Sequence, residues 1–182
     1  MYKVFALFIL MGLLSCGQQN ASQTATAEEQ PVGGGQSSVK DETSEPDVVR
    51  VAVSSPVHTT LVAALQAAEY VDALSNAGPF TVFAPTNEAF DKLPAGTVEG
   101  LLKPESKDAL RNILEYHVYV GAMKEDYIQD GMTLNQVNLD NITLTKKDGK
   151  ITVNGANVVG VVKASNGYVY VIDAVLLPPD KK

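Results

Sequence analysis

The chain has 182 residues, of which 45% are hydrophobic and 19% charged, and its formal net charge is -7 at pH 7. An acidic chain repels the phosphate backbone, so the charge excludes nucleic acid as a partner. Cys16 is the single cysteine, which excludes an intramolecular disulfide and a thiolate metal site; no metal or cofactor is predicted. The length predicts one globular domain with a further segment at one end.

Residues 1–15 are predicted to be a lipoprotein signal peptide. A lysine near the start precedes an apolar run from Val4 to Leu14, which is too short to span a bilayer. The run ends in Leu13-Leu14-Ser15-Cys16, which resembles a bacterial lipobox. The resemblance implies cleavage before Cys16 and a lipid anchor on that residue, and Gly17 in place of Asp implies the outer membrane of a Gram-negative bacterium. An ordinary cleaved signal followed by an incidental cysteine is the alternative.

Residues 16–47 are predicted to be the lipidated cysteine and a disordered acidic tether. The segment is rich in Gln, Ser, Thr, Ala and acidic residues and has almost no large apolar side chains. It therefore cannot bury enough surface to become ordered. A flexible coil of this length spans about 30 Å, which lifts a small domain off the lipid headgroups.

The folded domain is predicted to cover residues 48–182, because large apolar residues become frequent at Val48. It opens with a β-branched run, which Ser54-Ser55-Pro56 interrupts. The run consists of Val48, Val49, Val51 and Val53. This pattern is typical of a short strand.

A helical pattern follows, with Thr59 or Thr60 as the predicted N-cap and Gly78-Pro79 as its end. Its apolar positions recur at helical spacing. They are Leu61, Ala64, Leu65, Ala68, Val71 and Leu74.

Residues 80–84 form a compact β-prone run that Pro85 closes, and Thr86 stands where a helix N-cap is expected. The pattern predicts a strand that leads directly into a short helix ending by Pro94. A second short helix is predicted to be capped at Thr97.

The clearest helix runs from Lys107 to His117. Leu110, Ile113, Leu114 and His117 fall at i, i+3, i+4 and i+7 and form one stripe. His117 is therefore predicted to point toward the core or its rim.

The last third of the chain is predicted to consist of two hairpins. Residues 142–145 and 151–153 flank Asp148-Gly149, which favours a type I′ turn. Residues 158–162 and 168–172 flank Ser165-Asn166-Gly167. Helices followed by hairpins indicate an α+β fold.

Three segments of the chain resemble the fasciclin (FAS1) family. Residues 78–90, Gly-Pro-Phe-Thr-Val-Phe-Ala-Pro-Thr-Asn-Glu-Ala-Phe, resemble the first signature of that family, and residues 168–178, Tyr-Val-Tyr-Val-Ile-Asp-Ala-Val-Leu-Leu-Pro, resemble the second. Tyr116-His117 between them matches the Tyr-His pair of the family. The resemblance covers residues 51–179 and implies a β-wedge or sandwich of about seven strands flanked by several short helices.

The resemblance also implies a role in adhesion or recognition at cell surfaces, with Tyr116 and His117 as candidate partner-binding residues. We therefore predict a membrane-anchored interaction module that binds a protein or polysaccharide at the cell surface or matrix. The alternative is a carrier of a small apolar ligand in a pocket near the Tyr-His segment.

Catalysis is not predicted. The sequence has neither a Gly-x-Ser-x-Gly elbow nor a His-Glu-x-x-His helix, and no partner cluster is evident for His58 or His117. Packing is the simpler interpretation of His117 at the end of a core-facing stripe. Asp173, at the end of an apolar strand, is expected to accept backbone N–H bonds from a turn or a helix end.

Overall fold

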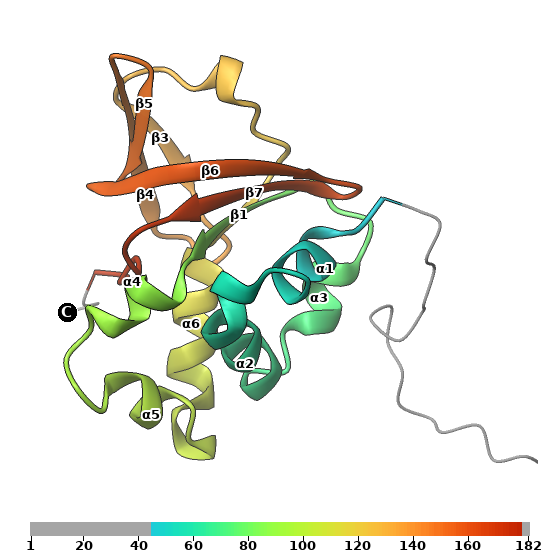
Figure 1. Cartoon of the computed structure of the whole chain (residues 1–182), viewed down its shortest axis with the longest axis vertical. Coiled ribbons are helices and arrows are strands. Elements are labelled where there is room, and N and C mark those ends of the chain that lie inside the picture. Colours follow the sequence, from blue (N-terminus) through green and yellow to red (C-terminus); the bar gives the residue numbers. More distant parts are fainter. Residues whose placement is uncertain (1–44, 180–182) are drawn as a thin grey trace, which may run out of the picture. The chain divides into compact units, whose positions relative to one another are not determined.

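The computed structural model of the chain describes residues 45–179 (Figure 1). The predicted signal peptide, Cys16 and most of the predicted tether lie outside the described residues. Within residues 45–179, no helix is both long enough and apolar enough to cross a membrane.

Seven strands form one mixed sheet in the order β2-β1-β7-β6-β5-β4-β3. Strands β1 and β7 pair in parallel through six registered positions, and the other neighbours are antiparallel. The strands are β1 Phe80–Pro85, β2 Val118–Val120, β3 Met132–Asn135, β4 Asn141–Lys147, β5 Lys150–Val153, β6 Ala156–Ala164 and β7 Gly167–Ile172. The predicted α+β class and its seven strands are confirmed.

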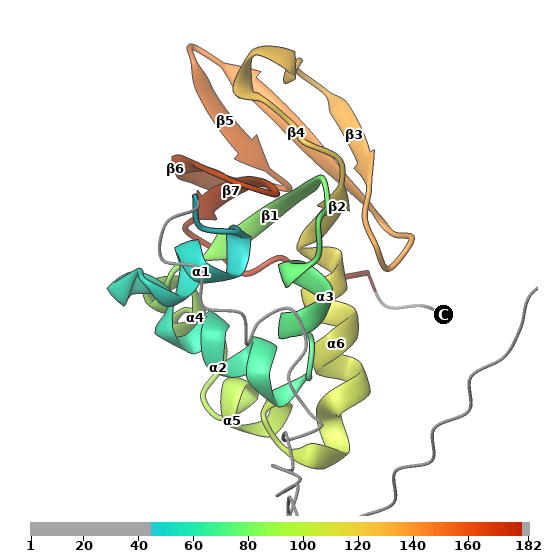
Figure 2. The ribbon, with the colours of Figure 1, turned by 90° about the vertical axis from the view of Figure 1, so that its right-hand side faces the viewer.

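Short helices pack against one side of the central strands β1 and β7, and strands β3 to β5 lie on the other side (Figures 1 and 2). The α-helices are α1 Val48–Val53, α2 Thr59–Ala67, α3 Val71–Ser75, α4 Asn87–Asp91, α5 Thr97–Leu101 and α6 Lys107–Tyr116. The 3-10 turns are η2 Pro56–His58, η3 Pro104–Ser106 and η4 Glu125–Tyr127.

Two apolar cores result from this arrangement. The helix-side core joins α1, α2, α3 and α6 to inward residues of β1 and β7, such as Val82 and Val169. The strand-side core is built around Phe83 and Tyr170, whose rings lie 5.7 Å apart, and includes buried residues of β4 and β5. Alternate residues of β1 and β7 enter opposite cores because successive strand side chains point to opposite faces.

The predicted strand at residues 48–53 is wrong, because this segment is helix α1. Asp47 caps it, since its carboxylate accepts a hydrogen bond from the Arg50 backbone N–H at 2.8 Å. The buried positions Val48, Val49, Val51 and Ala52 follow a helical period. The cap and the burial of one helix face override the weak β preference of valine.

The predicted helix from residue 59 to residue 74 is two helices, α2 and α3, separated at Glu69, whose φ is 51°. Neither Thr59 nor Thr60 is the cap, since both are helical residues. The amide oxygen of Asn87 instead accepts a hydrogen bond from the Thr60 N–H at 3.0 Å. A residue of the first signature segment thus caps a helix that lies far from it in sequence.

Of the remaining predictions, the cap at Thr86 and the turn at Asp148-Gly149 agree with the structure, and the cap at Thr97 is wrong. Thr86 does cap α4, by accepting a bond from the Ala89 N–H at 3.3 Å, whereas α5 begins after Gly96 and Thr97 is its first residue. Asp148 and Gly149 both have positive φ, 51° and 76°, as a type I′ turn requires. Strands β2 and β3 were not predicted from the sequence.

The turn between β6 and β7 fastens the helices to the sheet. The Asn166 side chain accepts a bond from the Val48 N–H at 2.9 Å and donates to the carbonyls of Leu74 and Asn76, each at 2.8 Å. At Gly167 an added Cβ would collide with the Phe80 backbone. This turn therefore needs both Asn166 and Gly167 to bring β1 beside β7.

Candidate functional site

Tyr116 and His117 lie at the end of α6, where the chain enters β2, and both are buried, with 2% and 3% of their surface exposed. The two side chains enter different regions. Tyr116 belongs to the strand-side core, and His117 lines a pocket on the helix side. Neither candidate partner-binding residue forms a surface, and whether either contributes to binding stays a prediction.

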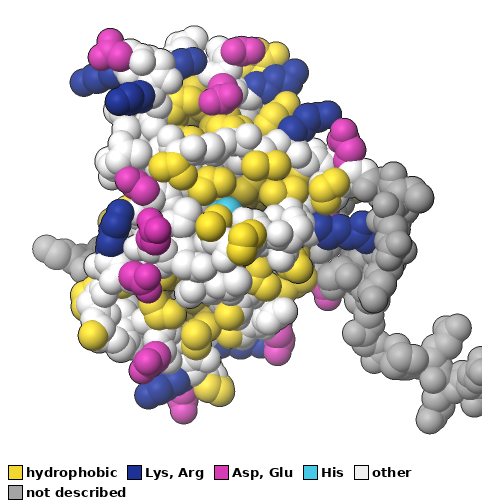
Figure 3. Space-filling model, in the orientation of Figure 1, with side chains coloured by type: hydrophobic (Ala, Val, Ile, Leu, Met, Phe, Trp, Pro, Cys, Tyr) yellow, Lys and Arg dark blue, Asp and Glu magenta, His cyan; other side chains and the backbone are white. Residues whose placement is uncertain are grey.

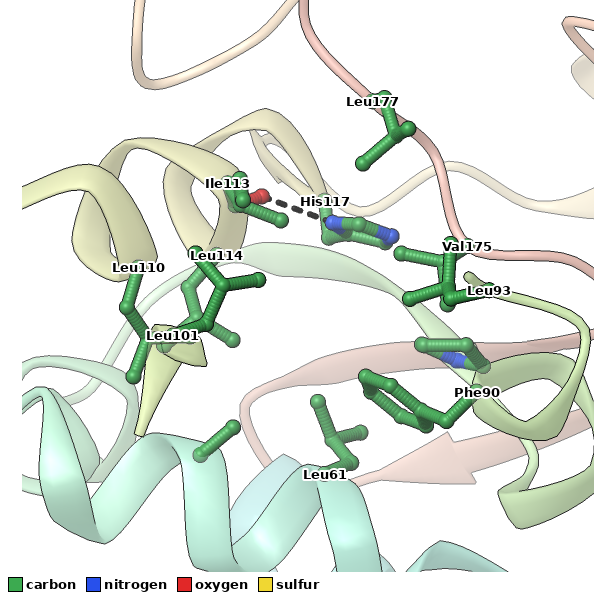
Figure 4. A pocket seen from close by; sticks show the side chains of 12 residues that line it. Leu61, Phe90, Leu93, Leu101, Leu110, Ile113, Leu114, His117, Val175 and Leu177 are labelled. Atoms are coloured by element: carbon green, nitrogen blue, oxygen red, sulfur yellow. Dashed lines mark hydrogen bonds between the residues drawn. The ribbon is translucent and has the colours of Figure 1, made fainter. Parts of the chain in front are cut away.

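His117 has a fixed hydrogen-bond pattern. Its Nδ1 donates to the Ile113 carbonyl at 2.7 Å (Figure 4), and its Nε2 accepts from the Leu176 backbone N–H at 3.0 Å. An acceptor on one ring nitrogen and a donor on the other define the neutral tautomer with hydrogen on Nδ1. Burial lowers the pKa of His117 to about 4, and the bond to Ile113 opposes that shift. The imidazole is therefore neutral at pH 7.

The pocket beside His117 is apolar and small. Its wall is formed by α2, α4, α5 and α6, and Val175 and Leu177 of the C-terminal segment close it (Figure 4). Its volume is about 20 Å³. A space of that size holds about one water molecule, and a lipid or a ring compound does not fit. In this structure the pocket lacks the room that the carrier alternative requires.

Tyr116 joins two loops on the strand side. Its hydroxyl donates to the Asn141 carbonyl at 3.0 Å and accepts from the Asn154 side-chain amide at 2.8 Å. Burial raises the pKa of the Tyr116 hydroxyl, so the group stays protonated at neutral pH. Tyr116 therefore positions the start of β4 and the turn between β5 and β6.

The β3–β4 loop, residues 136–140, projects from the ends of these strands near the end of α6 (Figure 2). Backbone bonds close it: the Gln136 N–H donates to the Asp140 carbonyl at 2.8 Å, and the Leu139 N–H donates to the Gln136 carbonyl at 2.9 Å. Gln136 and Asn138 are buried. The loop is held on both sides, because the Val137 N–H also donates to the Val118 carbonyl of β2 at 2.9 Å.

Leu139 stands at the tip of this loop with 78% of its surface exposed and a φ of 71°. Within residues 45–179 no other large apolar side chain is as exposed. Sequence reasoning missed this residue. The available signal was the run Asn135-Gln136-Val137-Asn138-Leu139-Asp140-Asn141, in which amide and acidic residues surround a leucine.

Asp173 has a structural role, as expected for its acceptor groups. Its carboxylate accepts bonds from the backbone N–H and the side-chain amide of Asn157, both at 2.8 Å. These bonds come from β6, not from a turn or a helix end as predicted. The side-chain bond is the main cause that lowers the pKa of Asp173.

The groups considered for chemistry do not share one site. His58 is buried and pairs through Nδ1 with the Ser55 hydroxyl at 2.9 Å, and burial lowers its pKa. His117 and Asp173 have the separate partners described above. Within residues 45–179, no group of three His, Cys, Asp or Glu side chains could hold a metal ion.

One face of the molecule shows how apolar surface is distributed. Apolar side chains form a band across its middle, at the level of β6 and β7, and charged side chains lie mostly around that band (Figure 3). Val159 and Val162 of β6 are exposed at 61% and 41%. Single exposed valines are ordinary on a soluble domain, so this band by itself does not define a site.

The chain belongs to the fasciclin family, since the Fasciclin domain matches residues 56–178. A solved FAS1 domain pair from the insect cell adhesion molecule Fasciclin I shares the fold, with a TM-score of 0.64 at 20% identity. That match covers 72% of this chain and 51% of the two-domain chain, so the present protein spans about half of its length.

Bacterial relatives are more similar in sequence. The protein sll1483 of Synechocystis sp. is 52% identical over 133 residues, which cover 72% of this chain and 73% of the relative. The cell surface glycolipoprotein MPB83 of Mycobacterium bovis is 39% identical over 158 residues, which cover 84% of this chain and 69% of the relative. The chain is thus a bacterial fasciclin domain protein, and a cell-surface interaction role fits its relatives.

Proposed function

We propose that this protein is an exported, lipid-anchored interaction module that recognises a protein or polysaccharide partner at the cell surface. One observation carries the proposal: the chain covers most of a cell surface glycolipoprotein at 39% identity. The predicted lipobox at Cys16 and the predicted tether agree with it, because together they would hold the domain at a membrane and let it reach outward.

We propose binding, without catalysis, as the activity. The polar groups considered for chemistry are engaged in separate structural bonds, with His117 held by Ile113 and Leu176, and Asp173 held by Asn157. A catalytic site would instead need such groups to converge on one reacting atom. Tyr116 and His117 are proposed to contribute to recognition by positioning the surface segments that they hold.

The anchor is tested by Cys16→Ser in the source organism. We expect the unchanged chain in the membrane fraction, labelled by a fatty-acid probe, and the variant unlabelled and released or unprocessed. Because Cys16 lies outside the fasciclin match, the variant should keep the melting temperature of the unchanged chain. A fully processed Cys16→Ser protein that stays in the membrane fraction would contradict the anchor.

Recognition is tested with labelled full-length protein and cells of the source organism that lack its gene. Saturable binding that unlabelled protein displaces would support the proposal. Treating the cells with protease or with periodate separates protein partners from polysaccharide partners. Absence of saturable binding to untreated cells, under conditions where the protein is folded, would refute the interaction role on these cells.

A further inference from the structure

We infer that the β3–β4 loop, residues 136–140, is a protein-binding surface whose anchor is Leu139. The inference deepens the proposed function and rests on it, since it names the surface and the class of partner. The partner is a protein that offers an apolar recess rimmed by backbone or amide hydrogen-bonding groups.

Leu139 has an unfavourable backbone conformation. Its φ of 71° lies in the left-handed region, which disfavours side chains with a Cβ. In hairpin loops built from a turn followed by a left-handed residue, that last position normally holds glycine. The other residues with positive φ and a side chain are Glu69, Asp148 and Asn154 within the described part of the chain, and none of them is apolar.

The side chain of Leu139 is also largely exposed. Leu139 combines an unfavourable backbone with a large apolar side chain that is 78% exposed, so it gains little from burial in the folded protein. Neither folding nor solubility accounts for leucine here, because glycine or asparagine would suit the backbone better and expose less apolar surface. Residues held in sparsely populated conformations concentrate at ligand-binding sites.

Side-chain hydrogen bonds hold the loop in place. The Asn138 side chain donates to the Asp140 carboxylate at 2.8 Å and to Asn112 of α6 at 3.2 Å. The Asn135 side chain donates to the Leu139 carbonyl at 2.9 Å and to the Asn141 side chain at 3.0 Å. A side chain presented on an ordered loop loses little entropy when it binds, which favours affinity.

The surroundings of Leu139 indicate the kind of partner. The exposed residues Asn135 and Asn141 flank the loop, the Asn135 amide donates to the Leu139 carbonyl, and Asp140 is the single charged residue of the loop. An apolar anchor within a polar, nearly uncharged rim is the usual composition of a protein–protein contact. A leucine has no planar ring on which a sugar could stack, so these features favour protein over polysaccharide.

Tyr116 gains a role in this arrangement although it is buried. Its hydroxyl donates to the carbonyl of Asn141, the first residue after the loop, and accepts from Asn154. It is therefore a positioning residue for the Leu139 surface. Tyr116→Phe removes the hydroxyl bonds and keeps the ring in the core, so its effect on binding should be smaller than that of changing Leu139.

The test compares Leu139→Gly with Val159→Thr in the full chain, using the cell-binding assay and thermal unfolding. Val159 is the matched control, because it is an exposed apolar residue on β6, outside the loop. We expect Leu139→Gly to weaken binding by about 30-fold, as for an interface hot spot, while its melting temperature is unchanged or higher. Leu139→Asn, which also tolerates positive φ, should behave likewise.

The control variant should bind like the unchanged chain, and Tyr116→Phe should bind less tightly than the unchanged chain but more tightly than Leu139→Gly. Protease treatment of the cells should abolish binding, and periodate should leave it intact. Unchanged binding by Leu139→Gly, or equal losses in Leu139→Gly and Val159→Thr, would overturn the inference. Loss after periodate alone would also overturn it in favour of polysaccharide. No binding by the unchanged chain would instead count against the interaction role itself.

Discussion

The helix side and the strand side of the central strands β1 and β7 differ in structure. On the helix side, short helices and the C-terminal segment enclose an apolar pocket around His117, and this side is held by side-chain caps from distant residues such as Asn87 and Asn166. On the strand side, a densely packed core around Phe83 and Tyr170 ends in a polar loop that exposes Leu139. The helix side thus encloses a small pocket, and the strand side carries the loop that we infer to bind a partner.

Tyr116 and His117 show this difference between the two sides within a single pair of residues. Two consecutive residues enter opposite sides, so Tyr116 reaches the polar loops and His117 reaches the C-terminal segment. A substitution of either residue can therefore change a surface without the side chain itself touching a partner.

The largest effect is expected from Phe83→Ala. Phe83 is 1% exposed in the strand-side core, and losing a buried ring leaves a cavity that costs about 3 to 5 kcal/mol. Phe90→Ala on the helix side is the matched control and should cost less, since that ring is only partly buried beside the pocket. Urea unfolding measures both free energies, and equal losses would show that the two cores are packed alike.

A pH effect of about 3 kcal/mol is expected from His117. Its pKa is about 4 in the folded protein and 6.5 as the ordinary value, so the unfolded chain binds more protons as the pH falls below 6.5. The stability that neutral His117 contributes is complete above pH 6.5 and is lost progressively down to about pH 4. Protonation of Nε2 also removes the acceptor for the Leu176 N–H.

The His117 effect is isolated by measuring unfolding free energies at several pH values for the unchanged chain and for His117→Gln. The difference between their slopes below pH 6.5 belongs to His117, because His58 and the carboxylates are common to both proteins. Identical slopes would mean that the pKa of His117 is the same in the folded and the unfolded chain.

Asn166→Ala should destabilise the protein by about 2 kcal/mol. The substitution removes the bond from the Val48 N–H, which begins α1, and both bonds to the end of α3. Asn76→Ala is a suitable control, because Asn76 contributes only its backbone carbonyl to this cluster. If both variants unfold at the same denaturant concentration, the turn between β6 and β7 does not fasten the helices.

The smallest effect, and the only gain, is expected from Leu139→Gly. Relief of the left-handed backbone contributes about 1 to 2 kcal/mol, and the greater freedom of glycine in the unfolded chain offsets about 0.5 to 1 kcal/mol. A net stabilisation of about 0 to 1.5 kcal/mol in chemical unfolding is therefore expected. A clear loss of stability would show that the leucine side chain packs in the folded state after all.

Most of the fold was predictable from the sequence where local signals coincide with tertiary contacts. The strand at Phe80 combines β-prone residues with buried positions, Thr86 is a preferred cap residue, and the turn at Asp148-Gly149 has the positive φ values that its type requires. The segment at Val48 was wrongly predicted to be a strand, because its helix depends on the Asp47 cap and on the burial of one helix face. Strand β2 was missed because three residues carry too little periodicity to be recognised.

The site was less predictable than the fold. The stripe that ends at His117 correctly indicated an inward position, but no local pattern reveals that Leu176, 59 residues away, donates to its ring. Leu139 could not be identified as a site residue from the sequence for a similar reason. Its importance depends on a φ value and on exposure, and neither follows from residue type in a polar loop.

The parallel pairing of β1 with β7 has a consequence for how the chain acquires its structure. Phe80 pairs with Gly167, so the middle of the sheet closes across more than half of the described sequence. Pairings between residues so distant in sequence form slowly, because loop entropy is lost before the contacts compensate for it. The sheet cannot close until the last strand has been synthesised, so the growing chain lacks its central layer for most of translation.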